Sequence, residues 1–290
     1  MTVSYNGAPK KTARRRKWRR ALLAALLLFL LLLIDSNLRL VTTRVVIASP
    51  RIPPAFDGFT IVQLSDVHGA VFGKDHETLL RKIIDARPDL IAITGDLISD
   101  EEDMKAIEPL LPRLVEIAPV YYVTGNHEWD SGCIRELFAL LKDAGVRVLR
   151  NEYARLERGG KTLLLAGIED PNGPWDMLKP EAVLTHIREA EGDTPYLILL
   201  AHRNGYLERL APYGADLILS GHAHGGMVRL PFTEGLVGPN RELLPKRTGG
   251  VYTWQDTTLF VSRGIGNGTG FPRFLNNPEL AVIVLQSAAK

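Results

Sequence analysis

Five short polar motifs, each following an apolar run, most constrain how this chain can fold. They are Asp66-Val67-His68, Gly95-Asp96, Gly125-Asn126-His127-Glu128, His202 and Gly221-His222-Ala223-His224. Five of the seven histidines lie in these motifs, a concentration that scattered structural histidines would not give. Because carboxylate, amide and imidazole groups are common protein ligands of divalent cations, the motifs predict a metal site built by several loops.

The apolar runs before the motifs have the length and composition of buried strands, and segments with helical spacing separate them. Strands are expected at residues 43–49, 60–64, 90–94, 120–123, 147–149, 154–156, 162–166, 196–200 and 217–219. Helices are expected at 76–86, 104–118, 133–144 and 181–190, with Pro109 and Pro112 bending or dividing the second. The Gly- and Pro-rich residues 226–285 are expected to form a β-rich lid.

Alternating strands and helices followed by consecutive strands indicate an α/β fold of two packed sheets with helices outside. In such sheets the loops at the carboxyl ends of neighbouring strands converge on one edge, where ligands bind. All five motifs occupy positions of that kind. We therefore expect them to meet at one place.

The first 40 residues predict that the chain is targeted to a membrane. Residues 1–20 form a basic tail without acidic side chains, of which 1–17 are expected to be disordered, and 21–34 are an unbroken apolar run. Trp18, Arg19 and Arg20, with a continuation through Leu40, could extend this run to the 20 or so residues that span a bilayer. No small-x-small cleavage site follows closely, which favours a retained anchor over 21–40 rather than a cleaved signal.

The basic tail also predicts orientation, because basic flanks stay in the cytoplasm. We expect a single-pass anchor in a bacterial cytoplasmic membrane with the body, residues 43–290, outside. A twin-arginine export signal at Arg15-Arg16, a helix lying on the cytoplasmic leaflet and a buried core helix are the alternatives.

Charge argues against a nucleic-acid partner. Eight of the 35 basic residues lie in the first 20 positions, so the rest of the chain carries 27 basic against 33 acidic residues. Nucleic-acid binding generally requires a basic surface. Cys133 is the only cysteine, which excludes an intrachain disulfide and a cysteine-built zinc site, and we expect it to be buried.

The donor set indicates which metal to expect. Asp66 and His68 alternate at a strand end, so both side chains can point to one side, and Asp96 follows a glycine that allows close approach. A carboxylate at such a centre can bridge two cations. Mixed oxygen and nitrogen ligands favour Mn, Fe or Zn over Mg or Ca.

The five motifs in this order resemble those of the calcineurin-like metallophosphoesterase family, and the resemblance extends over residues 56–285. It implies an α/β fold, a four-layer αββα sandwich of two mixed β-sheets, and a site for two divalent metal ions, with Mn expected and Fe or Zn as alternatives. Carried over by position, it assigns Asp66, His68 and His224 to the first metal, Asn126, His202 and His222 to the second, and Asp96 to both.

The resemblance also implies a mechanism. A metal-bridging hydroxide would attack the phosphorus of a phosphodiester or pyrophosphate, and His127 would stabilise the transition state or protonate the leaving oxygen. Glu128 would orient a neighbouring ligand, with a purely structural role as the alternative. His76 and His186 lie outside the motifs and are expected at the surface. Arg203, Arg263 and Arg273 could contact a phosphate but are expected at a solvated face.

Gly225-Gly226, Arg229-Leu230-Pro231 and Ser262-Arg263-Gly264-Ile265-Gly266 resemble the membrane-anchored branch of the family, which includes bacterial phosphodiesterases. That resemblance implies a lipid-linked or nucleotide-linked envelope substrate. The alternatives are a UDP-2,3-diacylglucosamine pyrophosphatase of lipid A synthesis, a phosphomonoesterase, and, in a different class, an inactive metal-holding binding module. Substrate and oligomeric state stay open.

Overall fold

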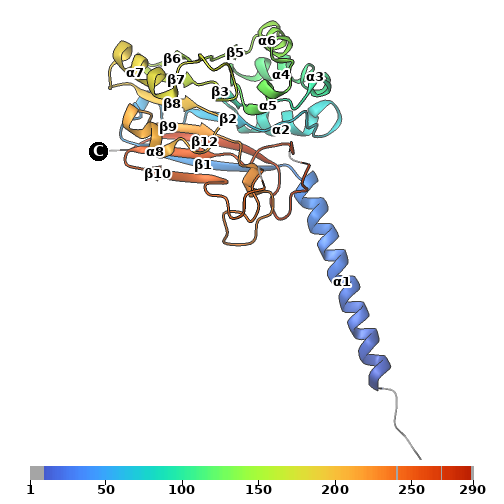
Figure 1. The fold of residues 1–290 in the computed structure, drawn as a ribbon. Coiled ribbons are helices and arrows are strands. Elements are labelled where there is room, and N and C mark those ends of the chain that lie inside the picture. The colour runs from blue at the N-terminus through green and yellow to red at the C-terminus, as the bar shows by residue number, and fades with distance from the viewer. Residues whose placement is uncertain (1–9, 240, 269, 289–290) are drawn as a thin grey trace, which may run out of the picture.

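Apolar strands pair into two mixed sheets that pack face to face in the computed structural model, which describes residues 10–239, 241–268 and 270–288 (Figure 1). The first sheet has the order β1-β12-β2-β3-β4-β5. Its strands are β1 (Val41–Ser49), β2 (Thr60–Leu64), β3 (Leu90–Thr94), β4 (Val120–Val123), β5 (Arg147–Val148) and β12 (Glu279–Ser287). Strands β2 to β5 run parallel, and β12 is antiparallel to β2.

The second sheet has the order β10-β11-β9-β8-β7-β6. Its strands are β6 (Glu152–Arg158), β7 (Lys161–Gly167), β8 (Tyr196–Leu200), β9 (Leu217–Ser220), β10 (Gly250–Trp254) and β11 (Thr257–Val261). Strands β7, β8, β9 and β11 are parallel, while β6 and β10 are antiparallel to their neighbours.

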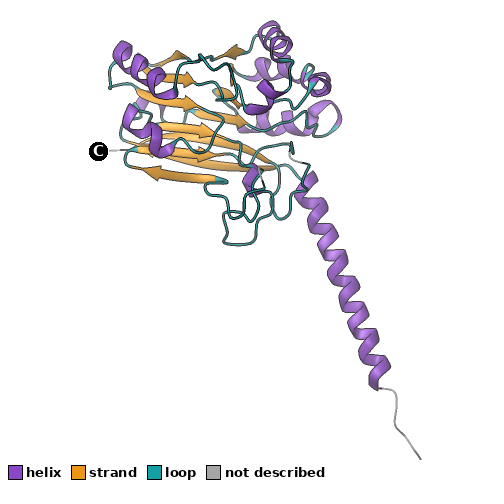
Figure 2. Cartoon of the chain, viewed as in Figure 1, coloured by secondary structure: helices purple, strands orange, loops and turns teal. Residues whose placement is uncertain are grey.

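Helices cover both outer faces (Figure 2). Those on the first sheet are α2 (Glu77–Ala86), α3 (Glu101–Ile107), α4 (Leu110–Ile117) and α6 (Ile134–Asp143), and α7 (Pro180–Glu191) and α8 (Leu207–Leu210) cover the second. The short α5 (Asn126–Asp130) and the 3-10 turns η1 (Pro54–Phe56), η2 (Lys74–His76), η3 (Ala211–Tyr213) and η4 (His224–Gly226) lie in connections.

Three apolar cores lie between these layers. One packs the helices on the first sheet, a second fills the space between the sheets, and a third packs α7 and α8 on the second sheet. The expected four-layer αββα sandwich is therefore confirmed. The strands expected at 60–64, 90–94, 120–123 and 196–200 are correct to the residue.

The helix expected at 104–118 is divided, as its prolines indicate. α3 ends at Ile107 and α4 begins at Leu110, with Pro109 between them. Pro112 lies in the first turn of α4, where backbone N–H groups have no acceptor within the helix. It is therefore accommodated without a second break.

The expectation of a β-rich lid over 226–285 is right about the strands, because the apolar runs at 259–261 and 281–285 lie in β11 (Thr257–Val261) and β12 (Glu279–Ser287), and wrong about the lid. β12 is inserted between β1 and β2 of the first sheet, and β11 lies between β10 and β9 of the second. Both strands carry buried apolar residues into the core between the sheets, including Phe260 and Ile283. β11 and β12 are therefore part of the sandwich and do not cover it.

The N-terminal helix α1 (Lys10–Leu38) projects from the body (Figure 1). It begins earlier than expected, so residues 10–17 are helical and not disordered, while 1–9 lie outside the described residues. Its segment Arg14–Leu38 is long and apolar enough to cross a membrane, and almost none of that segment is buried. The alternative of a buried core helix is therefore wrong.

Packing between the sheets predicts that Leu163→Ala strongly lowers the free energy of unfolding. Leu163 is fully buried in the core between the sheets, so the substitution removes apolar contacts and leaves a cavity. We expect the free energy of unfolding, measured in urea, to fall by about 3 kcal/mol. Leu178→Ala, at a half-exposed position, should change it by less than about 0.5 kcal/mol, and equal effects of the two substitutions would contradict the packing described.

Candidate metal centre

The five motifs follow the carboxyl ends of β2, β3, β4, β8 and β9, and the structure brings their side chains together. Backbone hydrogen bonds join the loops directly. The Asp66 N–H donates to the Gly95 carbonyl at 3.0 Å, and the His68 N–H donates to the Asp96 carbonyl at 3.0 Å. The loops after β2 and β3 are thereby fixed side by side, and strands from both sheets contribute to one site.

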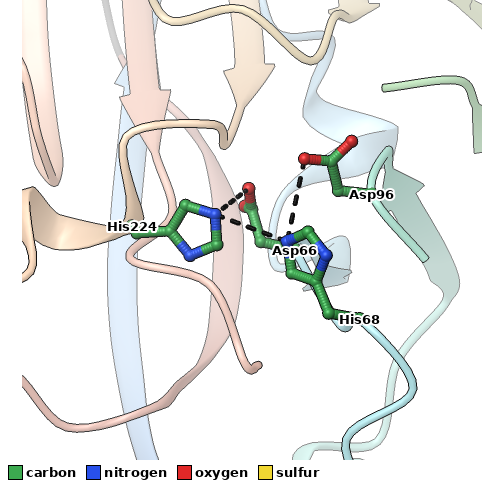
Figure 3. A group of neighbouring side chains, drawn as sticks. All are labelled: Asp66, His68, Asp96 and His224. Atoms are coloured by element: carbon green, nitrogen blue, oxygen red, sulfur yellow. Dashed lines mark hydrogen bonds and ion pairs between the residues drawn. The ribbon is translucent and has the colours of Figure 1, made fainter. Parts of the chain in front are cut away.

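One group of donors comprises Asp66, His68, Asp96 and His224, whose side chains point toward one another (Figure 3). His224 Nε2 lies 3.4 Å from Asp66 Oδ1 and 3.4 Å from His68 Nε2. His68 Nε2 lies 3.7 Å from Asp96 Oδ2. These atoms are close enough to bind one cation together.

A second group comprises Asp96, His202 and His222, so Asp96 belongs to both. His202 Nε2 lies 3.2 Å from Asp96 Oδ2 and 3.2 Å from His222 Nδ1. Asn126 adds an amide oxygen, Oδ1, that is buried without a hydrogen-bond partner. A buried polar atom without a partner is costly, and a cation at this position would provide one.

Most of these residues have an unusual backbone conformation. A positive φ is uncommon outside glycine and costs free energy, so such residues cluster where the surrounding structure imposes them, often at functional sites. Five candidate ligands share it: Asp66 (51°), His68 (47°), Asp96 (51°), His222 (68°) and His224 (48°). The loops are thus shaped to aim side chains into the site.

Two glycines allow the loops to approach closely. A Cβ on Gly125 would collide with the Asp96 carboxylate, and a Cβ on Gly221 would collide with Ser65 and Asp66. The glycine in each motif therefore makes room for a candidate ligand on another strand.

Burial keeps three of the imidazoles neutral. Desolvation lowers the pKa of His68 and of His222 to about 3, and it lowers the pKa of His224 well below its ordinary value. Neutral imidazole is the form that binds metal. These three histidines are therefore in the protonation state that cation binding requires.

The shared carboxylate is ionised. Burial would raise the pKa of Asp96, but the imidazole of His202, by its charge and its hydrogen bond, outweighs burial and holds that pKa well below its usual range. For His202, burial opposes the effect of Asp96, which nevertheless raises the histidine's pKa to about 10. Burial raises the pKa of Asp66 to about 6. The fixed negative charge of Asp96 thus lies between the two groups.

Outer contacts hold the imidazole rings in place. His68 Nδ1 lies 2.8 Å from Ser99 Oγ, and His202 Nδ1 lies 2.9 Å from the Thr94 carbonyl oxygen. In both rings Nε2 is left to face Asp96. Partners of this kind on the outer nitrogen are typical of metal-binding histidines.

Glu128 holds the backbone around Asp96 rather than facing the donors. Its buried carboxylate accepts hydrogen bonds from the N–H groups of Asp96 (3.0 Å), Leu97 and Gly125 (2.6 Å). Burial, followed by the charge of Asp96, raises its pKa to about 7. Glu128 therefore links the loops after β3 and β4.

His127 lies beside the donor groups and is partly exposed to solvent. Its backbone N–H donates to Asp96 Oδ1 at 3.0 Å, and its ring meets that of His68 edge-on with the centroids 4.8 Å apart. Unlike most of the candidate ligands, its side chain is only half-buried. It can therefore reach a molecule that enters from solvent.

Two arginines expected at a solvated face instead support the site. Arg273 is fully buried, and its guanidinium contacts the His224 carbonyl at 3.2 Å and His224 Nδ1 at 3.4 Å. Arg203 is paired with Asp170 at 2.6 Å and lies 3.1 Å from His222 Nε2. Arg203 directly follows the motif histidine His202, so the sequence could have indicated that it lies near the site. Arg273 is not next to any of the five motifs in the sequence, so its role could not be predicted from it.

The structure also places the two remaining histidines, Cys133 and Arg263. His76 is buried, and its Nε2 lies 2.8 Å from the Ala106 carbonyl oxygen, so its expected surface position is wrong. His186 is exposed and Cys133 is buried, as expected. Arg263 pairs with Glu279 at 2.9 Å and is mostly buried, not solvated.

Comparisons with known proteins agree with this geometry. The family model for calcineurin-like phosphoesterase matches residues 59–226. An uncharacterized metallophosphoesterase of Bacillus subtilis, YkuE, is 34% identical over 254 residues, 85% of each chain. The phosphodiesterase YaeI of Escherichia coli is 30% identical over 209 residues, 70% of this chain and 72% of that one.

A bovine transmembrane protein with a metallophosphoesterase domain is 31% identical over 270 residues, 85% of this chain and 57% of that protein. Among solved structures, the NAD nucleotidase of Haemophilus influenzae aligns with a TM-score of 0.50 at 15% identity, over 71% of this chain and 45% of that one. That likeness concerns the fold alone.

The shared position of Asp96 predicts the effect of Asp96→Asn on metal content. Both donor groups use this carboxylate, so its replacement by a neutral amide should weaken both. After reconstitution with Mn and dialysis, we expect the variant to retain less metal per chain than the unaltered protein, measured by elemental analysis. Asp143→Asn, at an exposed position, is the control. Full metal content in the Asp96→Asn variant would contradict the shared role.

Proposed function

This chain belongs to the calcineurin-like phosphoesterase family and is a hydrolase of phosphoesters, and we propose that it is a membrane-anchored enzyme with two metal ions that cleaves a phosphodiester or pyrophosphate bond. The main support for this proposal is that two groups of metal-binding side chains share Asp96. One shared carboxylate between two groups is the arrangement that a two-metal hydrolase requires.

We assign the metal-binding residues by these groups. Asp66, His68 and His224 would hold one ion, Asn126, His202 and His222 the other, and Asp96 both. Bound divalent ions supply positive charge that activates water and neutralises the phosphate. We propose Mn, with Fe or Zn as alternatives, because the donors mix oxygen and nitrogen.

His127 is the proposed catalytic side chain. The hydrogen bond from its backbone to Asp96 fixes the start of α5, and the half-buried imidazole lies beside His68. From there it can donate a hydrogen bond to a phosphate oxygen or a proton to the leaving oxygen. The contacts of Glu128 make it a positioning residue for Asp96.

The proposed anchor is α1. It is long and apolar, it projects from the body, and relatives in cattle and zebrafish are named as transmembrane proteins. The basic residues at its start favour a cytoplasmic N-terminus and an extracytoplasmic body in a bacterial inner membrane.

The end of α1 is connected to the candidate metal centre. Asn37 accepts a hydrogen bond from the Arg273 N–H at 3.0 Å and donates to the Arg273 carbonyl at 2.8 Å, and Arg273 contacts His224. A cavity of about 330 Å³ is lined by Asn37, Leu38 and Arg273 together with residues 70–73 and 265–267. This placement supports a lipid-linked or nucleotide-linked envelope substrate, with the UDP-2,3-diacylglucosamine pyrophosphatase of lipid A synthesis as the specific alternative.

Restoring metal to the stripped full-length protein in detergent tests the proposal. We expect Mn to restore cleavage of a chromogenic phosphodiester. Preference for the matching monoester would identify a phosphatase instead. Binding of metal without turnover of either compound would favour the inactive binding module.

The position of His127 predicts a separate effect in the same assay. His127→Asn should keep the metal content but lower kcat roughly 100-fold to 10,000-fold, as expected for loss of a general acid. His186→Asn, at an exposed histidine on α7, should leave kcat unchanged. An unchanged kcat in the His127→Asn variant would remove this residue from the mechanism.

The proposed orientation predicts which side of the membrane exposes the loop before α7. In a Cys133→Ala background, Trp175→Cys places a thiol at a position that is 97% exposed. A membrane-impermeant maleimide should label this variant in intact spheroplasts as fully as in lysed cells. Labelling only after lysis would place the body in the cytoplasm.

A further inference from the structure

Large apolar side chains are exposed on two loops next to α1. Phe232 is fully exposed, and Leu243, Leu244 and Phe271 are 79%, 69% and 45% exposed. We call this set, with the loops that carry it (residues 228–239, 241–244 and 271–274), the apolar loop surface. Large apolar side chains that are exposed on neighbouring loops often contact a partner or a membrane.

The two loops form one structural unit. β-bridges join Val228 to Phe274 and to Val237, and Val237 to Leu243. The Arg229 N–H donates to the Phe274 carbonyl at 3.0 Å, and the Phe274 N–H donates to the Met227 carbonyl at 3.1 Å. The exposed side chains are therefore held by paired backbone.

This unit lies alongside the apolar part of α1. The rings of Phe29 and Phe274 are in contact, with centroids 5.1 Å apart. Phe29 lies nine residues before Leu38, the end of α1, which corresponds to about 13 Å along a helix. Figure 1 shows the orange-to-brown loops beside the helix, on the side of the body from which it extends. If α1 spans a bilayer, Phe274 lies beside a part of α1 that is inside the bilayer.

The end of α1 is fixed to these loops. Ser36 Oγ accepts a hydrogen bond from the Leu275 N–H at 2.8 Å, and Asn37 is bonded to both backbone groups of Arg273. The Asn277 amide donates to the Asp35 carbonyl at 2.7 Å. These contacts set the direction in which α1 leaves the body, and hence the side of the body that faces a membrane.

The charge of the surface fits a membrane with anionic lipid. Residues 228–248 contain four basic and two acidic side chains, and Arg241 and Lys246 are exposed near Leu243 and Leu244. Aromatic and leucine side chains combined with cations are typical of segments that lie in the lipid interface.

We propose that the apolar loop surface rests in the interface of a phospholipid bilayer, beside α1, and forms a second membrane contact. This inference rests on the proposed membrane anchoring. Arg229 also donates to the Gly225 carbonyl at 3.0 Å, directly after the candidate ligand His224. The second contact would therefore hold the metal centre against the membrane surface, where it takes substrates with a lipid-borne phosphoester.

The test measures the depth of single labels on the full-length protein in nanodiscs of phosphatidylcholine and phosphatidylglycerol. In a Cys133→Ala background, a fluorescent thiol label is placed through Phe232→Cys on the apolar loop surface and through Leu27→Cys on α1. Trp175→Cys is the matched control, because Trp175 is an aromatic residue that is equally exposed and lies in the connection before α7, away from α1.

We expect lipid-borne quenchers to remove most of the fluorescence at positions 232 and 27 and little at 175. Quenching at 27 with none at 232 would overturn the second contact and leave the anchor standing. Absence of quenching at both 232 and 27 would overturn the anchor and, with it, the second contact. Because Phe232 is fully exposed, its replacement should not affect folding.

Discussion

The Asp96 carboxylate is the group on which the rest of the site depends. It lies 3.2 Å from His202 and 3.7 Å from His68 and accepts a hydrogen bond from the backbone N–H of His127, while the backbone N–H of Asp96 donates to Glu128. Burial alone would neutralise this carboxyl, but His202 beside it keeps it charged. A buried negative charge shared by two donor groups requires positive charge on both sides, which two cations would supply.

The two sheets explain how residues from distant parts of the chain reach this carboxylate. Parallel strands of both sheets end at the same edge, and the core between the sheets fixes their separation. Positive φ angles at five candidate ligands and the close approach of Gly125 and Gly221 then shape the loops. Such strained loops persist because the packed strands beneath them are stable. Arg273 contacts both the end of α1 and His224, so α1 and the site are parts of one structure.

Most of this arrangement could be predicted from local patterns. Buried parallel strands are continuous apolar runs, which gave β2, β3, β4 and β8 to the residue, and the motifs after them identified the side chains that converge. Long-range pairing could not be predicted in this way. β12 joins the first sheet through partners more than 200 residues away, so residues 226–285 resembled a lid. Burial of His76 and Arg273 likewise depends on carbonyl groups supplied by distant segments.

Anomalous diffraction from crystals of the Mn-loaded protein would show whether two metal ions share Asp96. We predict two anomalous peaks about 3.5–4 Å apart, the spacing of two-metal sites, with the Asp96 carboxylate between them. One peak should contact Asp66, His68 and His224, and the other Asn126, His202 and His222. A single peak, or two peaks of which only one contacts Asp96, would contradict the shared carboxylate as the centre of the site.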